Sequence, residues 1–192
     1  MFSNDELKQL IAGKVIGNMY PYSTDNENEL EHYLKRLAAQ LKRERIHLYE
    51  EPAHFGSGYA SYIQWLCYED KHVTTTENDS TRTVKIEGIA VLISRLTPVV
   101  LIGRANMSET SSLDGNTLGR SSSVFATPSD LQIETEFMQL AQRLQQLFMQ
   151  YQFSVLTYDD VVKPLPFDTD IETVFRKKRD YLVWDAIFYW TD

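Results

Sequence analysis

The chain has 192 residues, of which 43% are hydrophobic and 24% charged, with 27 acidic against 19 basic side chains. Ordinary hydrophobicity excludes a disordered or fibrous chain, and a formal net charge of -8 argues against a dedicated nucleic-acid binder. We therefore expect one globular domain over residues 1–192, with a core that needs no metal or disulfide.

The number of cysteines and the N-terminal residues indicate in which cellular compartment the protein is expected. The single cysteine, Cys67, cannot form an intramolecular disulfide, and acidic residues stand where a signal peptide has its positive region. The longest apolar run, residues 89–93, is far shorter than the roughly 20 residues that cross a bilayer. These features predict a cytoplasmic protein without a membrane segment.

Two helices are predicted before the first strand. Ser3 and Glu6 have the spacing of a capping box, and the apolar residues after them predict a short helix that ends at Gly13. A second helix is predicted over residues 25–45, because leucines recur there at three-and-four spacing. Its acidic residues gather at the start and its basic residues at the end, an arrangement that the helix dipole explains.

Strand patterns follow in a block. Aromatic and β-branched stretches at 59–68, 84–94 and 99–105 predict a three-stranded antiparallel meander over residues 59–105. Residues 89–93 scarcely alternate, so we expect both faces of the middle strand to be covered. Eight of the 21 residues from 106 to 126 are Ser or Thr, which predicts a long polar loop.

The C-terminal third returns to helix and strand. Thr127 and Pro128 predict the start of a helix that runs to Tyr151. Residues 181–190 are apolar on both alternating faces, which predicts a C-terminal strand docked in the sheet. Together these elements indicate an α+β fold, with a mainly antiparallel sheet and helices packed on one face.

Motifs for catalysis or cofactors are not found in this sequence. Its histidines are scattered without metal-ligand spacing and no phosphate-binding loop occurs, so neither a metal nor a cofactor is predicted. The basic run 176–179 is bracketed by acidic residues, which cancel its attraction to nucleic acid. Cys67 lies among apolar residues and is expected to be an inert core side chain.

Tyrosine content and acidity favour a surface that binds a basic protein, since the chain holds 11 tyrosines. We expect a small acidic intracellular protein-binding module without catalytic activity, most concretely a bacterial toxin-neutralising (immunity) protein with a basic toxin domain as its partner. Residues 1–45 hold seven acids and seven bases, so the partner is expected on the rest of the chain. The predicted contacts are Glu69, Asp70, Glu77, Asp79 and the anchors Tyr62 and Tyr68.

Two alternatives stay open, and the sequence does not fix the oligomeric state. In the first, an enzyme or small-ligand-binding protein, the loop 106–126 closes over a pocket. The residues of that pocket would be Arg104, Arg120, Asp159 and Asp160. In the second, a subunit of a larger assembly, an apolar patch at residues 188–190 is exposed.

Overall fold

The computed structural model describes residues 2–50, 58–123 and 125–191. Within this part the chain has the predicted α+β architecture, built on a seven-stranded and mainly antiparallel sheet. Its longest strands, β5 (Thr81–Ser94) and β6 (Val99–Ser112), form a hairpin through the turn 95–98. The short strand β8 (Ser154–Val155) lies parallel to β6.

The remaining strands of the sheet flank this hairpin. They are β1 (His47–Glu50), β3 (Tyr62–Tyr68), β4 (Val73–Glu77) and β7 (Thr117–Ser122). The strand order is β1-β3-β5-β6-β7, and β4 pairs with the half of β5 that β3 leaves free. A separate pair joins β2 (Tyr59–Ala60) to β9 (Trp190–Thr191). The three strands of the predicted meander are β3, β5 and β6, and they are neighbours in the predicted order.

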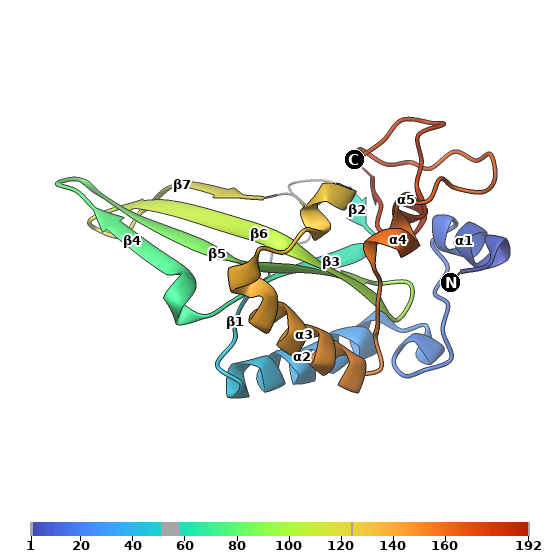
Figure 1. Cartoon of the computed structure of the whole chain (residues 1–192), viewed down its shortest axis with the longest axis horizontal. Coiled ribbons are helices and arrows are strands. Elements are labelled where there is room, and N and C mark those ends of the chain that lie inside the picture. The colour runs from blue at the N-terminus through green and yellow to red at the C-terminus, as the bar shows by residue number, and fades with distance from the viewer. Residues whose placement is uncertain (1, 51–57, 124, 192) are drawn as a thin grey trace.

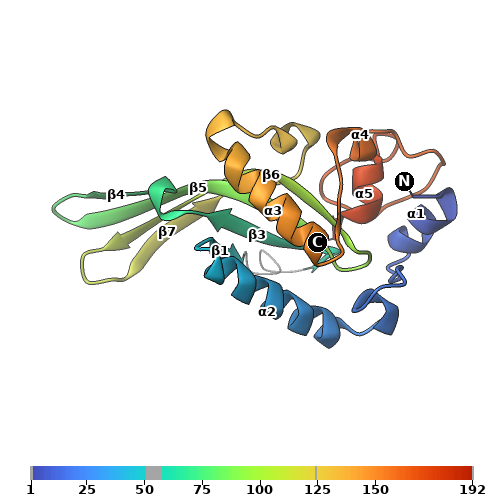
Figure 2. The ribbon, with the colours of Figure 1, turned by 60° about the horizontal axis from the view of Figure 1, so that its bottom comes forward.

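Helices cover both faces of the sheet, and the expectation of a single covered face is wrong. On one face lie α2 (Glu27–Arg43) and α3 (Met138–Gln150), as Figure 2 shows. Packed against the other face are α1 (Asn4–Ile11), α4 (Tyr158–Val161) and α5 (Val183–Ile187).

The middle of β5 explains this arrangement. Ile89, Val91 and Ile93 face α2 and α3, whereas Ala90 and Leu92 belong to the core on the other side. All five side chains are fully buried. The two-sided burial that this run predicts is thus confirmed, and burying apolar side chains on both faces needs a cover on each.

Beyond the helices, the sheet continues as an arm of strands, formed by residues 73–87 and 106–122 (Figure 1). The segment 106–126, expected to be a loop, instead completes β6 and forms β7 around a turn at 113–116. Threonine suits a pleated strand and pairs across it, as the 3.1 Å contact between the Oγ1 atoms of Thr83 and Thr110 shows. The many polar residues of this segment therefore reflect strands that are exposed to solvent, and not a loop.

The helix expected from Thr127 begins only at Met138. Thr127 precedes a 3-10 turn, η3 (Pro128–Leu131), and after an extended stretch at 132–134 a second 3-10 turn, η4 (Thr135–Phe137), leads into the helix. Leu131 packs against one core and Ile133 against the other, so the chain passes between the two faces here. A continuous helix could not make this passage.

Residues 181–190 form α5 and the start of β9 rather than the expected strand. The Asp185 carboxylate accepts the backbone N–H of Leu182 at 2.8 Å and so caps the helix start. Because apolar residues fill every alternate position, periodicity did not separate a buried strand from a buried helix. Phe188 and Tyr189 are buried, so the apolar patch expected at 188–190 is largely covered.

Cys67 lies in β3 as a fully buried side chain, and burial raises the pKa of its thiol to about 12. The thiolate is the reactive form of cysteine, so we expect the native protein to resist a water-soluble disulfide reagent at mildly alkaline pH. After unfolding in denaturant, one thiol per chain should react. Equal reaction rates for the native and unfolded chain would contradict this placement.

Candidate functional site

The acidic residues predicted to contact a partner do not share one surface. Glu69, at the end of β3, forms ion pairs with Lys71 at 2.8 Å and Arg143 at 2.6 Å. Lys71 first, and then Arg143, holds the pKa of Glu69 below its usual range. Its charge is therefore balanced within the chain.

The other three acids are exposed but separated. Asp70 lies 2.7 Å from the Nε2 atom of His47, beside β1. Glu77 ends β4, and Asp79 lies in the turn that follows, at the far end of the arm (Figure 1). The arm therefore places two of the predicted contacts away from the other two.

The two predicted tyrosine anchors differ in exposure. Tyr62 is buried and packs against Phe175 and Phe188, which corrects the expectation that it anchors a partner. Tyr68 is half-buried, and its ring stacks on His47 with the centroids 5.2 Å apart. Tyr62 is therefore part of the core, and Tyr68 packs at the edge of the sheet.

The residues of the alternative pocket are also apart. Arg104 lies on the face of α3, with its guanidinium 2.6 Å from Glu134. Arg120 is ion-paired with Glu109 and donates a hydrogen bond to the hydroxyl of Tyr49, which packs against the opposite core. The sheet therefore separates the two arginines.

The paired carboxylates of the alternative lie in α4. Asp159 is exposed, and Asp160 accepts hydrogen bonds from the backbone N–H of Thr157 at 2.8 Å and from its hydroxyl at 2.7 Å. These two hydrogen bonds hold the pKa of Asp160 below its usual range. Arg104 and Asp160 line different pockets.

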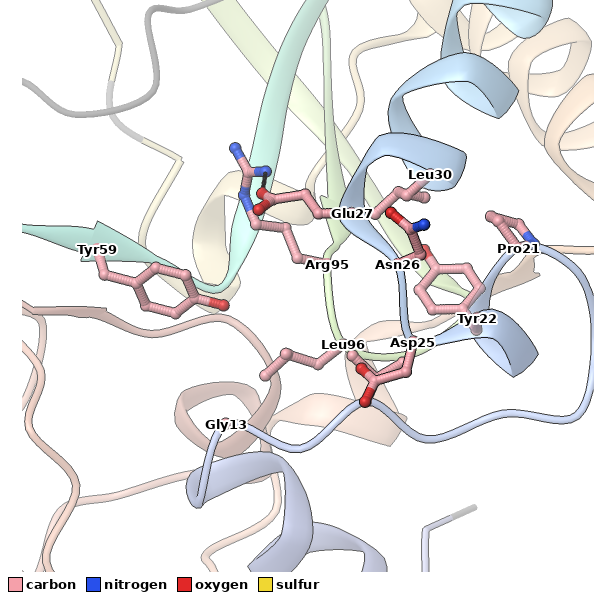
Figure 3. Close-up of a pocket in the computed structure, with 11 residues that line it drawn as sticks. Gly13, Pro21, Tyr22, Asp25, Asn26, Glu27, Leu30, Tyr59, Arg95 and Leu96 are labelled. Carbon is pink, nitrogen blue, oxygen red and sulfur yellow. Dashed lines mark hydrogen bonds and ion pairs between the residues drawn. The ribbon is translucent and has the colours of Figure 1, made fainter.

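A different set of residues forms a pocket of about 220 Å³ at the start of α2 (Figure 3), hereafter the α2 pocket. Four segments meet there: the chain after α1, the turn that leads into α2 with the start of that helix, β2, and the β5–β6 turn. Val15, Leu30 and Leu96 supply its apolar lining. Its polar rim is formed by Asp25, Asn26, Glu27, Tyr59 and Arg95.

Local sequence sets the position of this rim. Asn26 caps α2, because its side-chain oxygen accepts the backbone N–H of Asn28 at 3.0 Å. Asp25, just before it, has a φ of 49°, a left-handed conformation that aspartate tolerates better than most residues. The helix therefore begins at the pocket, with acidic side chains in its first turn.

One ion pair joins the helix to the sheet across the pocket. Arg95, in the β5–β6 turn, lies 2.6 Å from the Glu27 carboxylate (Figure 3). Asp25 forms no ion pair with any residue that the structure describes. The rim therefore keeps one carboxylate whose charge is not balanced by a direct partner.

Two tyrosines border the pocket from opposite sides (Figure 3). Tyr22 is buried and donates a hydrogen bond to the backbone oxygen of Ser94 at 2.6 Å, and burial raises its pKa. Tyr59 reaches toward the pocket from β2, and partial burial raises its pKa as well. Both hydroxyls therefore stay protonated at neutral pH, and since the Tyr22 proton is held by Ser94, the Tyr59 hydroxyl is the one that can donate to an occupant of the pocket.

A series of three tyrosines begins at Tyr20, which is next in the chain to the lining residue Pro21. The rings of Tyr20, Tyr33 and Tyr151 meet edge to face, with neighbouring centroids 5.7 Å and 5.5 Å apart. Arg36 lies over the rings of Tyr20 and Tyr33, at 5.7 Å and 5.2 Å. The Tyr20 hydroxyl donates to Glu29 at 2.5 Å, which raises the pKa of Tyr20. Exposed aromatic area thus adjoins the acidic turn.

Sequence reasoning passed over this site although part of its signal was visible. In the sequence, the helix dipole alone accounts for the acids at the start of α2. The zero net charge of residues 1–45 concealed them, because the balancing Lys42 and Arg43 lie at the other end of α2. The abundance of tyrosine, which includes Tyr20 and Tyr59, was the remaining clue.

No family model, curated protein sequence or solved structure matches this chain. Among the residues that the structure describes, no helix is both long and apolar enough to cross a membrane. In that same part, no three His, Cys, Asp or Glu side chains converge as they would around a metal ion. The function is therefore inferred from the geometry of the α2 pocket and its surroundings.

Proposed function

We propose that this chain is a protein-binding module that accepts a basic side chain of its partner in the α2 pocket. The observation that carries the proposal is the size of the pocket together with its charge. A volume of about 220 Å³ lies below the roughly 300–1,000 Å³ of typical small-molecule sites, so it suits one side chain. The apolar lining matches the stem of a lysine or arginine, and Asp25 matches its charged head.

The surroundings of the pocket support a protein as the partner. Tyrosine and arginine dominate binding hot spots, and Tyr20 and Tyr59 here remain 41% and 39% exposed. Glu29 adds a further acidic side chain in the first turn of α2, where it accepts the Tyr20 hydroxyl, whereas Glu31 is paired with Lys35 at 3.7 Å. Such charge speeds the encounter with a basic protein, while buried aromatic contacts slow its release.

In its most concrete form, the proposal is a toxin-neutralising (immunity) protein of the bacterial cytoplasm. Toxins that cleave nucleic acid bind a polyanion through a basic cleft, and a protein with a net charge of -8 is steered toward such a cleft. A toxin arginine or lysine would enter the α2 pocket, and the tyrosine series would cover the surface beside it.

The test uses a partner captured from the native host at low salt, or the product of the neighbouring gene. Asp25→Asn combined with Glu29→Gln should weaken its binding about tenfold, because both charges are lost while each side chain keeps a hydrogen-bond acceptor. The salt dependence of the dissociation constant should fall as well. Titration calorimetry at two salt concentrations measures both effects.

Matched controls come from other surfaces of the chain. Glu77→Gln combined with Asp79→Asn removes the same charge from the arm, and Tyr158→Ala removes an exposed tyrosine from α4. Both should leave binding within about twofold of the unaltered chain, whereas Tyr59→Ala should weaken it about tenfold. Equal effects of the pocket and arm variants, or no partner at any salt concentration, would overturn the proposal.

A further inference from the structure

A second pocket, of about 540 Å³, is lined by residues of α1, α4 and α5 and by the turn between β5 and β6. Its volume falls within the roughly 300–1,000 Å³ of typical small-molecule sites. Three of its lining residues are prolines, Pro98, Pro164 and Pro166, whose rings fix the backbone φ angle and limit how far the wall can rearrange. The pocket shares no lining residue with the α2 pocket, so its occupant is independent of the partner proposed there.

Most of the lining is apolar. Phe2, Leu7, Leu156, Val183 and Ile187 contribute hydrocarbon or aromatic surface. Ile187 and Leu7 are buried members of the core, while Phe2, Leu156 and Val183 are half-buried. An occupant therefore needs an apolar body, which gains free energy by leaving water.

The charges at this pocket balance. Glu6 and Asp160 are negative, and Lys163 is positive. The positive charge of the N-terminus acts on both carboxylates, whose pKa values are lowered first by hydrogen bonds from Ser3 and Thr157 and in part by this charge. An ionised ligand would therefore lose its hydration without meeting a net opposite charge.

One uncharged polar residue of the lining, Thr97 in the β5–β6 turn, is only 3% exposed. Its hydroxyl forms no hydrogen bond with any residue that the structure describes. This hydroxyl is not fully enclosed by protein atoms, so it opens on the pocket that Thr97 lines. A buried hydroxyl without a partner costs free energy, which an oxygen atom of a ligand at this point would recover.

We propose that this pocket binds an uncharged molecule with an apolar body and one hydrogen-bonding oxygen, of the class of alkyl and aryl alcohols. The apolar body covers Leu156 and Val183 and is thereby removed from water. The ligand oxygen pairs with the Thr97 hydroxyl, which can both donate and accept a hydrogen bond.

Three probes of equal chain length test the proposal: phenylbutanol, phenylbutylamine and phenylbutyrate, which are uncharged, positive and negative at neutral pH. Titration calorimetry with the full chain should show the alcohol binding at least about fivefold more tightly than either ion, because an ion loses more hydration in the pocket. Thr97→Val should weaken alcohol binding about fivefold, as expected for the loss of one hydrogen bond. Thr97→Ser keeps the hydroxyl and should retain the affinity within about twofold.

Further measurements separate the site from unspecific binding and from unfolding. Thr97→Val removes a hydroxyl that lacks a protein partner, so the melting temperature of the free chain should stay the same or rise. Leu156→Trp should fill the pocket and abolish alcohol binding, with folding checked by circular dichroism. Thr76→Val, at an exposed position of β4, is the matched control and should leave the affinity unchanged.

Three results would overturn the proposal. The first is an amine or carboxylate that binds as tightly as the alcohol, and the second is an unaltered alcohol affinity in Thr97→Val or Leu156→Trp. The third is that the unaltered chain does not bind the alcohol.

Discussion

Replacing Asp185 with alanine is expected to lower the free energy of unfolding by about 3 kcal/mol or more, the largest effect of any single change considered. The Asp185 side chain is 0% exposed and that of its partner Arg176 only 14%, with 2.6 Å between their charged groups. Arg176 also donates to the backbone oxygen of Ala126 at 3.2 Å and lies over the Trp184 ring. Alanine would leave this nearly buried guanidinium without its counter-ion.

A matched surface pair provides the control for this prediction. Asp170 and Lys178 are 3.1 Å apart, but their side chains are 74% and 53% exposed. Asp170→Ala should therefore cost less than about 1 kcal/mol. Urea denaturation measures both variants, and equal losses would contradict the assigned role of the buried pair.

A double replacement sharpens the same argument. Burial raises the pKa of Asp185 although Arg176 and the Leu182 amide oppose the shift, so keeping the carboxylate ionised in the interior is costly. Asp185→Leu combined with Arg176→Met should recover part of the stability lost in Asp185→Ala. No recovery would show that the hydrogen bond to the Leu182 amide, and not the ion pair, holds α5.

Replacing Gly103 with alanine is the second change expected to have a large effect. A Cβ atom at this position of β6 would lie 2.5 Å from the Phe125 ring and closer still to the backbone oxygen of Asp130. Phe125 is itself buried, with its ring edge-to-face with Trp184 at 5.5 Å. Because a backbone atom cannot rotate aside, we expect a loss of about 2–3 kcal/mol.

Gly119, on β7, is the matched control because a Cβ atom there would meet nothing within 4 Å. Gly119→Ala should leave the free energy of unfolding unchanged or raise it by up to about 1 kcal/mol, since alanine restricts the unfolded chain. Urea denaturation of the two variants tests the difference. Similar stabilities would mean that the 125–131 segment does not pack on β6 as described.

Local patterns predicted much of the fold. Leucine spacing marked α2 to within two residues at each end, and the unbroken apolar run 89–93 correctly indicated a strand covered on both faces. The errors arose where local signals are ambiguous. Residues 181–190 are apolar in every register, and the Ser- and Thr-rich arm looked like a loop because exposed strands lack an apolar face.

The candidate site was much less predictable, for a physical reason. Its charge pattern depends on the 68-residue separation between Glu27 and Arg95, which only the tertiary fold brings together. Tyr62 is an error of the opposite kind, a residue expected at the binding surface that lies in the core. Its polar neighbours in the sequence suggested exposure, but its side chain is buried. The residue types suggested that an acidic, tyrosine-rich surface binds a partner. The place of that surface follows only from the packing of α2 on the sheet.

Hydrogen exchange of the chain, free and bound to its captured partner, tests the central claim most directly. Amides at the start of α2 donate only to its cap and to the turn before it, as Asn28 does to Asn26, so they should exchange faster in the free chain than the amides of the sheet. The proposal predicts that partner binding slows exchange at residues 20–28 and 94–97, around the α2 pocket, and leaves the arm unchanged. Protection confined to the arm, at residues 73–87 and 106–122, would contradict it.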